Sequence, residues 1–206
     1  KDTEIARLIL WAESSSGFGN DPKKNTETLK QITTEAQRLD AAFLIGGDRP
    51  SSPGEFENYG IFIDERGEIS GEYLKQHPVP FGEYIPFRKY LDWIPPLSLV
   101  PRDMVRGTQQ QVFTTNKNEI KISPVISFEG SFDRYIRRSV VQGAEVVVIL
   151  TNQASYGESG MSDQFILMSR ANAISNNRDI AHAAITGKSA FISGIDGDIY
   201  SSSGLF

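Results

Sequence analysis

Residues 73–88 read YLKQHPVPFGEYIPFR, and this stretch places Lys75 and Glu83 in a segment that contains three prolines. Proline fixes φ and removes a backbone donor, so the segment cannot form a regular helix or a central strand. Loops that are held on a rigid scaffold often carry the chemistry of a protein. The stretch is therefore either an ordered surface loop with solvated charges or part of a site, and the sequence on both sides bears on that choice.

The chain before this stretch is predicted to alternate strands with a helix. Apolar runs from Ile5 to Trp11 and from Ala41 to Gly46 predict two buried strands. Between them, Asn25 to Leu39 carries apolar residues at helical spacing behind a capping asparagine. Asn58 to Ile63 and Glu68 to Leu74 predict a hairpin, and its second arm leads directly to Lys75.

The chain after this stretch begins with an apolar arm, residues 89–101, which is rich in aromatic and aliphatic side chains. Beyond it, strands are predicted at Val112–Thr115, Glu119–Ser123, Val125–Phe128, Glu145–Thr151, Asp179–Thr186 and Ser189–Gly194. One helix is predicted from Phe132 to Val140, and a second is expected to be capped by Asp163 and to end near Asn177. Strands that alternate with helices and hairpins predict an α/β layered fold with mixed sheets.

The composition indicates one folded domain, residues 1–206, and excludes several kinds of site. A chain of 206 residues that is 39% hydrophobic can bury one core. Acids and bases are interspersed and the net charge is −5, which argues against a nucleic-acid partner. With no cysteine and two histidines, the sequence predicts no metal site and no cofactor. Its longest aliphatic run, Val146 to Leu150, is far shorter than the roughly 18 to 20 residues of a membrane helix.

Polar side chains lie at or just beyond the ends of four predicted strands. They are Glu13, Lys75 with Glu83 beyond it, Ser127 with Glu129, and Asn152. In open α/β sheets, sites collect where the carboxyl ends of strands meet. A carboxylate, an ammonium and a hydroxyl are the groups that acyl transfer uses as base, oxyanion stabiliser and nucleophile.

These residues lie in motifs that resemble, in order and spacing, the nitrilase-like domain of apolipoprotein N-acyltransferase. The motifs are Trp11-Ala12-Glu13, the stretch from Tyr73 to Pro86, Ile126-Ser127-Phe128-Glu129, and Thr151-Asn152 with Gly157. The Val-Pro-Phe-Gly-Glu run is the specific part, since the order of glutamate, lysine and nucleophile alone fits the whole carbon-nitrogen hydrolase superfamily. The resemblance implies a four-layer α-β-β-α sandwich, here expected to lack the first strand and helix of that fold.

The resemblance also implies a reaction and a cellular setting. A fatty acyl group would pass from a phospholipid to the N-terminal amine of a diacylglyceryl-cysteine lipoprotein through an acyl-enzyme. The expected partners are the phospholipid donor, the lipoprotein acceptor and a membrane reached through segments outside this chain. The domain would be a fragment of a larger membrane protein and would lie at the extracytoplasmic face of the cell membrane.

The same resemblance assigns roles to single residues. It implies that Glu13 is the general base, that Lys75 stabilises the oxyanion and that Ser127 occupies the nucleophile position. The expected catalytic side chains are Glu13, Lys75, Ser127, Glu83 and Glu129. The expected oxyanion and supporting residues are Phe128, through its backbone N–H, and Asn152. The expected substrate-binding residues are Trp93, Ile94 and Tyr156.

Four positions depart from the family pattern. Serine at position 127 replaces the usual cysteine, and a hydroxyl yields its proton less readily than a thiol with a pKa of about 8.5. The other three are Ala12, Ser155 and Asn172. Ser127 is therefore open to three interpretations: a working serine acyltransferase, a pseudoenzyme that binds lipid or lipoprotein, or a deliberately replaced cysteine. A soluble amidase of the nitrilase superfamily is a further alternative.

Overall fold

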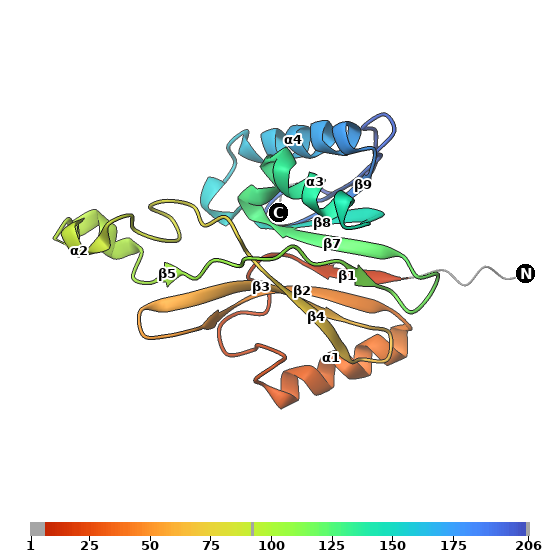
Figure 1. Ribbon diagram of the computed structural model, residues 1–206, viewed down its shortest axis with the longest axis horizontal. Helices are drawn as coiled ribbons and strands as arrows, with labels where there is room; N and C mark the ends of the chain where they lie inside the picture. The colour runs from red at the N-terminus through yellow and green to blue at the C-terminus, as the bar shows by residue number, and fades with distance from the viewer. Residues whose placement is uncertain (1–6, 92, 205–206) are drawn as a thin grey trace, which may run out of the picture.

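The computed structural model describes residues 7–91 and 93–204 and arranges them in four layers (Figure 1). Two β-sheets stack face to face in the middle. Helix α1 covers the outer face of one sheet, and helices α3 and α4 cover the outer face of the other. The order of layers is therefore α-β-β-α, which confirms the expected sandwich.

The first sheet holds five strands in the order β1-β2-β3-β4, with β5 paired to β3. Its strands are β1 (Leu8–Trp11), β2 (Ala42–Pro50), β3 (Glu55–Ile63), β4 (Ile69–Leu74) and β5 (Asp103–Met104). β1 runs parallel to β2, whereas β2, β3 and β4 are antiparallel neighbours. The sheet is mixed, and β1 lies at its edge.

The second sheet holds six strands in the order β11-β10-β9-β8-β7-β6. Its strands are β6 (Phe113–Thr114), β7 (Lys121–Ile126), β8 (Val146–Asn152), β9 (Asp179–Ile185), β10 (Ala190–Ile192) and β11 (Ile199–Ser202). β7, β8 and β9 are parallel, so their carboxyl ends lie at one edge. This sheet is also mixed, because its outer pairs are antiparallel.

The helices follow from local sequence signals. They are α1 (Thr26–Leu39), α2 (Arg88–Leu91), α3 (Asp133–Val141) and α4 (Met161–Asn176), with 3-10 turns η1 (Pro95–Leu99), η2 (Ser127–Ser131) and η3 (Ala154–Tyr156). The side chain of Asn25 accepts from the backbone N–H groups of Glu27 and Thr28 and so caps α1 as predicted. Gly143 lies just after the end of α3, and its φ of 97° falls in the left-handed region that glycine tolerates.

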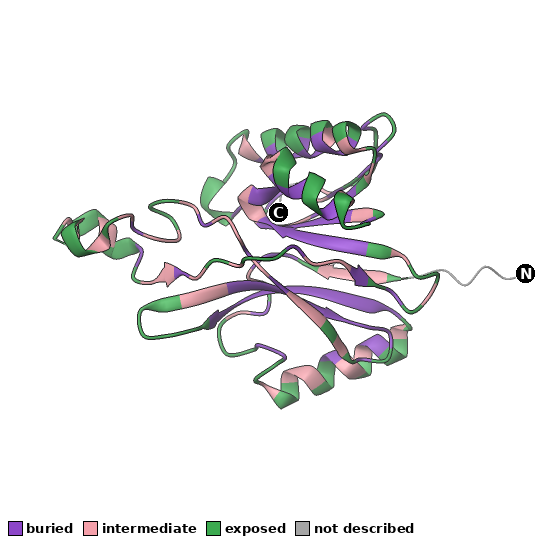
Figure 2. Cartoon of the chain, in the orientation of Figure 1, coloured by how far each residue is buried: buried purple, intermediate pink, exposed green. Residues whose placement is uncertain are grey.

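The core lies on the faces of the sheets rather than around the helices alone (Figure 2). Between the sheets, Leu44 and Phe62 of the first sheet share one buried cluster with Ile126, Val148 and Leu150 of the second. A second cluster fills the space under α3 and α4, and a third fills the space under α1. Apolar residues therefore bury both faces of each sheet.

Two predicted strand boundaries were wrong. β2 does not end at Gly46 but continues to Pro50. The glycine at position 46 does not mark a turn, because close packing requires it. A Cβ on Gly46 would lie 2.3 Å from the carbonyl oxygen of Ala12. The segments predicted as Glu119–Ser123 and Val125–Phe128 form one strand, β7, and Phe128 lies in the 3-10 turn that follows. Pro124 is tolerated because β6 pairs only with Lys121 and Ile122.

The predicted cap of α4 was also wrong. The helix begins at Met161 behind Gly160, and Asp163 lies inside its first turn, where it pairs with Lys188. A carboxylate is favourable both at the cap and in the first turn, so the pattern alone does not separate the two. The first predicted strand is observed from Leu8, while Ile5 lies outside the described residues.

Candidate active site

Glu13, Lys75 and Glu83 meet in the interior of the molecule. Glu13 lies two residues beyond β1, Lys75 directly follows β4, and Glu83 lies in the proline-stiffened loop. Lys75 Nζ is 2.9 Å from Glu13 Oε1 and 2.5 Å from Glu83 Oε1. The Lys75 side chain is 0% exposed, so its ammonium bridges two carboxylates away from bulk water.

Glu13 is held by neighbours from three different elements. Its Oε1 accepts from Lys75 and from Nδ2 of Asn58 on β3, which lies at 2.9 Å. Its Oε2 accepts from the backbone N–H of Asn152 at the end of β8, also at 2.9 Å. The Asn152 contact joins the two sheets, so the position of the carboxylate depends on both.

The electrostatics keep Lys75 charged. Burial by itself lowers the pKa of the Lys75 ammonium, but the carboxylates of Glu13 and Glu83 outweigh burial and hold that pKa above its usual value. A fixed cation in a low-dielectric interior interacts more strongly with a developing negative charge than it would in water. This cluster can therefore stabilise an oxyanion next to a carboxylate that accepts a proton.

Ser127 lies at the carboxyl end of β7, on the first residue of η2. Its φ of 54° is in the left-handed region, which serine rarely occupies and which costs on the order of 1–3 kcal/mol. The turn packs tightly against β8, because a Cβ on Gly130 would lie 2.8 Å from the side chain of Ile149. Nδ2 of Asn172 also donates to the carbonyl of Gly130 at 2.8 Å. The strained backbone is thus enforced by its surroundings.

Glu129 joins the turn at Ser127 to the segment that carries Lys75. Its Oε2 accepts from the N–H of Ile126 at 2.8 Å and from the hydroxyl of Tyr73 at 2.7 Å. Its Oε1 accepts from the backbone N–H groups of Gln76 at 2.5 Å and His77 at 2.9 Å. Burial raises the pKa of Glu129, and these donors act in the opposite direction. Both of its oxygens are therefore occupied by the fold.

Aromatic rings line the neighbourhood of Ser127. The ring of Phe128 lies 4.9 Å from that of Phe132 and 6.2 Å from that of His77. Phe165 lies 6.4 Å from Phe128 and 5.9 Å from Tyr156, one of the residues expected to bind substrate. The structure therefore connects Tyr156 to the turn that carries Ser127 through a row of rings.

The other two residues expected to bind substrate lie in the apolar arm. Trp93 and Ile94 stand between α2 and η1, the part of the chain that Figure 1 places at the far left, away from the two sheets. Trp93 is 79% exposed, and Tyr90 and Leu99 of the same arm are also exposed. The arm thus projects as an apolar surface and does not pack into the core.

Three residues beside the predicted ones were missed at the sequence level: Asn58, Tyr73 as a hydrogen-bond donor, and Asp48. Asn58 and Asp48 are cross-strand partners on β3 and β2, and both are buried. The alternation of inward and outward residues along a strand places Asn58 on the same face as Phe62. A polar residue in an inward position of a strand was the signal that could have identified both.

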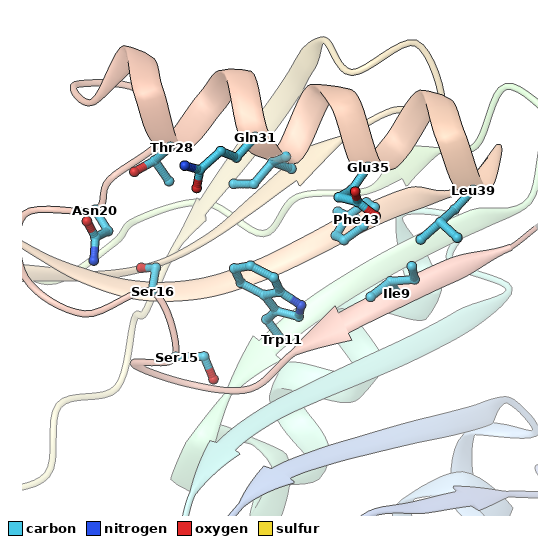
Figure 3. Close-up of a pocket in the computed structure, with 11 residues that line it drawn as sticks. Ile9, Trp11, Ser15, Ser16, Asn20, Thr28, Gln31, Glu35, Leu39 and Phe43 are labelled. Atoms are coloured by element: carbon cyan, nitrogen blue, oxygen red, sulfur yellow. The ribbon is translucent and has the colours of Figure 1, made fainter.

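A groove of about 620 Å³ lies apart from this site, between α1 and the edge strand β1 (Figure 3). Trp11 and Ile9 of β1 face Gln31, Glu35 and Leu39 of the helix across it. Its lining includes none of the predicted catalytic residues.

Within residues 7–91 and 93–204, none of the helices has the length and apolar character of a membrane span. The same residues contain no cluster of histidine and acidic side chains that could hold a metal ion.

Comparison with known proteins assigns the sequence to a family. The family model described as carbon-nitrogen hydrolase matches residues 3–204. The chain belongs to the carbon-nitrogen hydrolase family. Solved structures agree in fold: an amidase from Nesterenkonia sp. has a TM-score of 0.71 at 18% identity, covering 98% of this chain and 74% of the amidase. At that identity the likeness concerns the fold alone.

Curated relatives of this carbon-nitrogen hydrolase chain include apolipoprotein N-acyltransferases. The enzyme of Mycolicibacterium smegmatis is 32% identical over 190 residues, which cover 90% of this chain and 31% of the relative. The enzyme of Geobacter metallireducens is 30% identical over 189 residues, which cover 90% of this chain and 35% of the relative. The chain thus spans about a third of the length of these relatives.

Proposed function

We propose that this chain is the catalytic domain of an N-acyltransferase, which moves a fatty acyl group from a phospholipid to the N-terminal amine of a diacylglyceryl-cysteine lipoprotein. The observation that carries the proposal is the buried cluster of Glu13, Lys75 and Glu83, joined through Glu129 to the strained turn at Ser127. The similarity to apolipoprotein N-acyltransferases supports this acceptor and donor over other substrates of the family.

In the first half-reaction, Oγ of Ser127 attacks the carbonyl carbon of the phospholipid ester and its proton passes to Glu13. The negative charge moves to the carbonyl oxygen, where the Lys75 ammonium and the N–H of Phe128 stabilise it. When the carbon–oxygen bond to the glycerol breaks, Glu13 returns the proton to the leaving oxygen. The products are a lysophospholipid and an acyl ester on Ser127.

In the second half-reaction, the neutral amine of the acceptor attacks the acyl ester on Ser127. Glu13 takes a proton from the attacking nitrogen and delivers it to Oγ of Ser127 as the ester bond breaks. An amide forms and the free serine is restored. An oxyester is a poorer acyl donor to an amine than a thioester, so we expect this step to limit the rate.

The remaining carboxylates and Asn152 hold these groups in place. Glu83 accepts from the N–H of Val79 at 2.8 Å while it binds Lys75, so it fixes the ammonium from the loop side. Glu129 fixes the backbone on both sides of the site and acts as a positioning residue. Asn152 orients Glu13 through its backbone N–H. We propose that the row of aromatic rings that includes Tyr156 binds the acyl chain of the substrate.

The apolar arm is proposed to contact the donor lipid. Its exposed aromatic side chains, Trp93 among them, are suited to the region between lipid headgroups and acyl chains. Together with Ile94, they would guide an acyl chain from a bilayer toward Ser127. This role requires the domain to face the extracytoplasmic side of a membrane, next to its lipoprotein acceptor.

An acyl-enzyme trapping experiment tests the proposal. The full-length protein is incubated with phospholipid and a diacylated lipopeptide, and the acyl adduct on Ser127 is measured by mass spectrometry. We expect an adduct in the wild type and none in Ser127→Ala. Ser127→Cys should form it faster, because a thiol with a pKa of about 8.5 ionises more readily than a hydroxyl. Absence of both adduct and triacylated product in the wild type and in Ser127→Cys would refute the proposal.

A lipid- or lipoprotein-binding module without turnover is the second candidate, and the serine at position 127 favours it. This candidate expects Ser127→Ala to complement a lipoprotein acylation defect as well as the wild type does. A clear loss of complementation in Ser127→Ala, at equal protein level, would exclude it and support acyl transfer.

A further inference from the structure

Asp48 lies beside the catalytic cluster, although the mechanism above does not use it. On β2 it shares a face with Leu44, which packs against the second sheet. Its cross-strand partner is Asn58, and the neighbouring Gly60 on β3 faces Leu150 and Pro124 of the second sheet. Both Asp48 and Asn58 are more than nine-tenths buried. The pair therefore lies between the sheets, where Asn58 contacts Glu13.

Two buried oxygens in this pair have no hydrogen-bond partner among the described residues: Oδ1 of Asp48 and Oδ1 of Asn58. Directly opposed residues on one face of an antiparallel pair have Cβ atoms about 4.5–5.5 Å apart, so these side chains are within reach of each other. The amide of Asn58 is not free to turn, because its Nδ2 already donates to Glu13. Two buried acceptors on side chains within reach of each other can both be satisfied by one proton between them.

We propose that Asp48 is a positioning residue that carries a proton, and that its Oδ1–H donates to Oδ1 of Asn58. One proton then satisfies both oxygens. It also directs the Asn58 N–H toward Glu13. When Oδ1 of the Asn58 amide accepts from the Asp48 hydroxyl, its Nδ2 must point the other way. The catalytic base is thus oriented by a neutral carboxylic acid that touches no substrate.

The groups that face Asp48 favour this neutral form. Glu13 and Glu83 repel a negative charge on it, whereas Lys75 and the hydroxyl of Ser14 act in the opposite direction. Burial is the largest cause and raises the pKa of Asp48 from 3.8 to about 6. When Asp48 ionises, its carboxylate competes with Glu13 for the N–H of Asn58. As the pH rises through the pKa of Asp48, Glu13 therefore loses the Asn58 contact, one of the three that orient it.

Infrared titration tests the proton directly and does not depend on any activity. The carboxylic-acid C=O band of Asp48 is identified as the difference between wild type and Asp48→Asn, in protein labelled with ¹³C at aspartate. We expect the band to persist to about pH 6. Disappearance of the band at the ordinary aspartate value of 3.8 would overturn the proposal, because water or another donor would then bridge the two oxygens.

The kinetic test rests on the proposed function and compares two variants of Asp48. Asn at position 48 keeps a permanent N–H donor toward Asn58, whereas Leu removes the donor at similar size. The rate of Asp48→Asn divided by that of the wild type should rise by up to tenfold per pH unit above the wild-type pKa, since only the wild type loses its donor. Asp48→Leu should be at least tenfold slower than Asp48→Asn at every pH.

Asp21→Asn is the matched control, because Asp21 is a buried aspartate that pairs with Arg49 instead of facing Asn58. Its rate relative to wild type should not change with pH. A flat ratio for Asp48→Asn across pH 5 to 8 would also overturn the proposal. If no acyl transfer is detected in any protein, the proposed function fails, and the infrared result still decides the protonation of Asp48.

Discussion

Glu129 shows at the scale of one residue why a carboxylate, and not an amide, occupies the turn after β7. Its two oxygens accept from three backbone N–H groups and from the hydroxyl of Tyr73, and it is fully buried. Four donors that converge on one side chain require a group with acceptors only. Glutamine has the same shape but turns an N–H₂ group toward two of those donors.

Glu129→Gln should therefore lower the free energy of unfolding by about 2–3 kcal/mol, since at least one buried backbone N–H loses its acceptor. Tyr73→Phe removes one donor to Glu129 and one acceptor of Gln76 Nε2, which also donates to Gln110, and should cost about 1 kcal/mol. Urea unfolding followed by tryptophan fluorescence measures both. Equal stability of Glu129→Gln and wild type would show that the four contacts do not hold the turn.

At the scale of elements, β2 is held close to the end of β1 by glycine. Gly46 and Gly60 are cross-strand partners, yet their surroundings differ. A Cβ on Gly46 would lie 2.3 Å from the backbone carbonyl of Ala12, whereas a Cβ on Gly60 would lie 3.4 Å from a methyl group of Leu150. The first contact involves backbone that cannot move alone, and the second is an ordinary contact with a flexible side chain.

Gly46→Ala should destabilise the protein by about 1–3 kcal/mol, because β1 must shift to admit the methyl group. The shift would also displace Glu13, which directly follows Ala12, so the rate of the proposed acyl transfer should fall even under conditions where the variant is still folded. Gly60→Ala is the control and should stay within about 1 kcal/mol of the wild type. Thermal unfolding measures both variants, and similar losses in the two would contradict the argument from close packing.

The elements that sequence predicted well are those with local signals. The Asn25 cap and the spacing of apolar residues define α1, and the unbroken apolar run of β8 matches to within one residue at each end. The end of β2 was predicted wrongly at Gly46, because glycine is required there by the close approach of the Ala12 carbonyl, 34 positions earlier in the chain. Glu13, Lys75 and Glu83 were predicted and do meet. Asn58 and Asp48 were missed, because their role depends on strand register.

At the scale of the whole molecule, the burial map separates a closed double sheet from an open arm (Figure 2). Tyr90, Trp93 and Leu99 are all more than 70% exposed, although they belong to a segment of largely apolar residues. Exposed apolar side chains that gather in one segment indicate a surface that meets another apolar phase. We therefore expect the arm to bind lipid bilayers.

Replacing Tyr90 and Trp93 together by Ser should weaken binding to vesicles of phosphatidylethanolamine and phosphatidylglycerol by about tenfold, because interfacial binding scales with buried apolar area. Replacing Phe191 and Tyr200 by Ser is the control, since both are exposed but lie on β10 and β11. Co-sedimentation with vesicles measures the affinity. An equal loss in the two double variants would indicate nonspecific adsorption rather than a function of the arm.

The hydrogen bond from Asn152 to Glu13 joins residues that are 139 positions apart in the chain. Glu129 binds backbone that is 52 and 53 positions away. Contacts of such high sequence separation form late, because long loops must close before the contacts contribute any stability. A folding intermediate with only one sheet formed would therefore lack the Asn152 contact that positions Glu13, the proposed base. In refolding experiments, recovery of activity should follow the final docking of the two sheets and lag behind recovery of secondary structure.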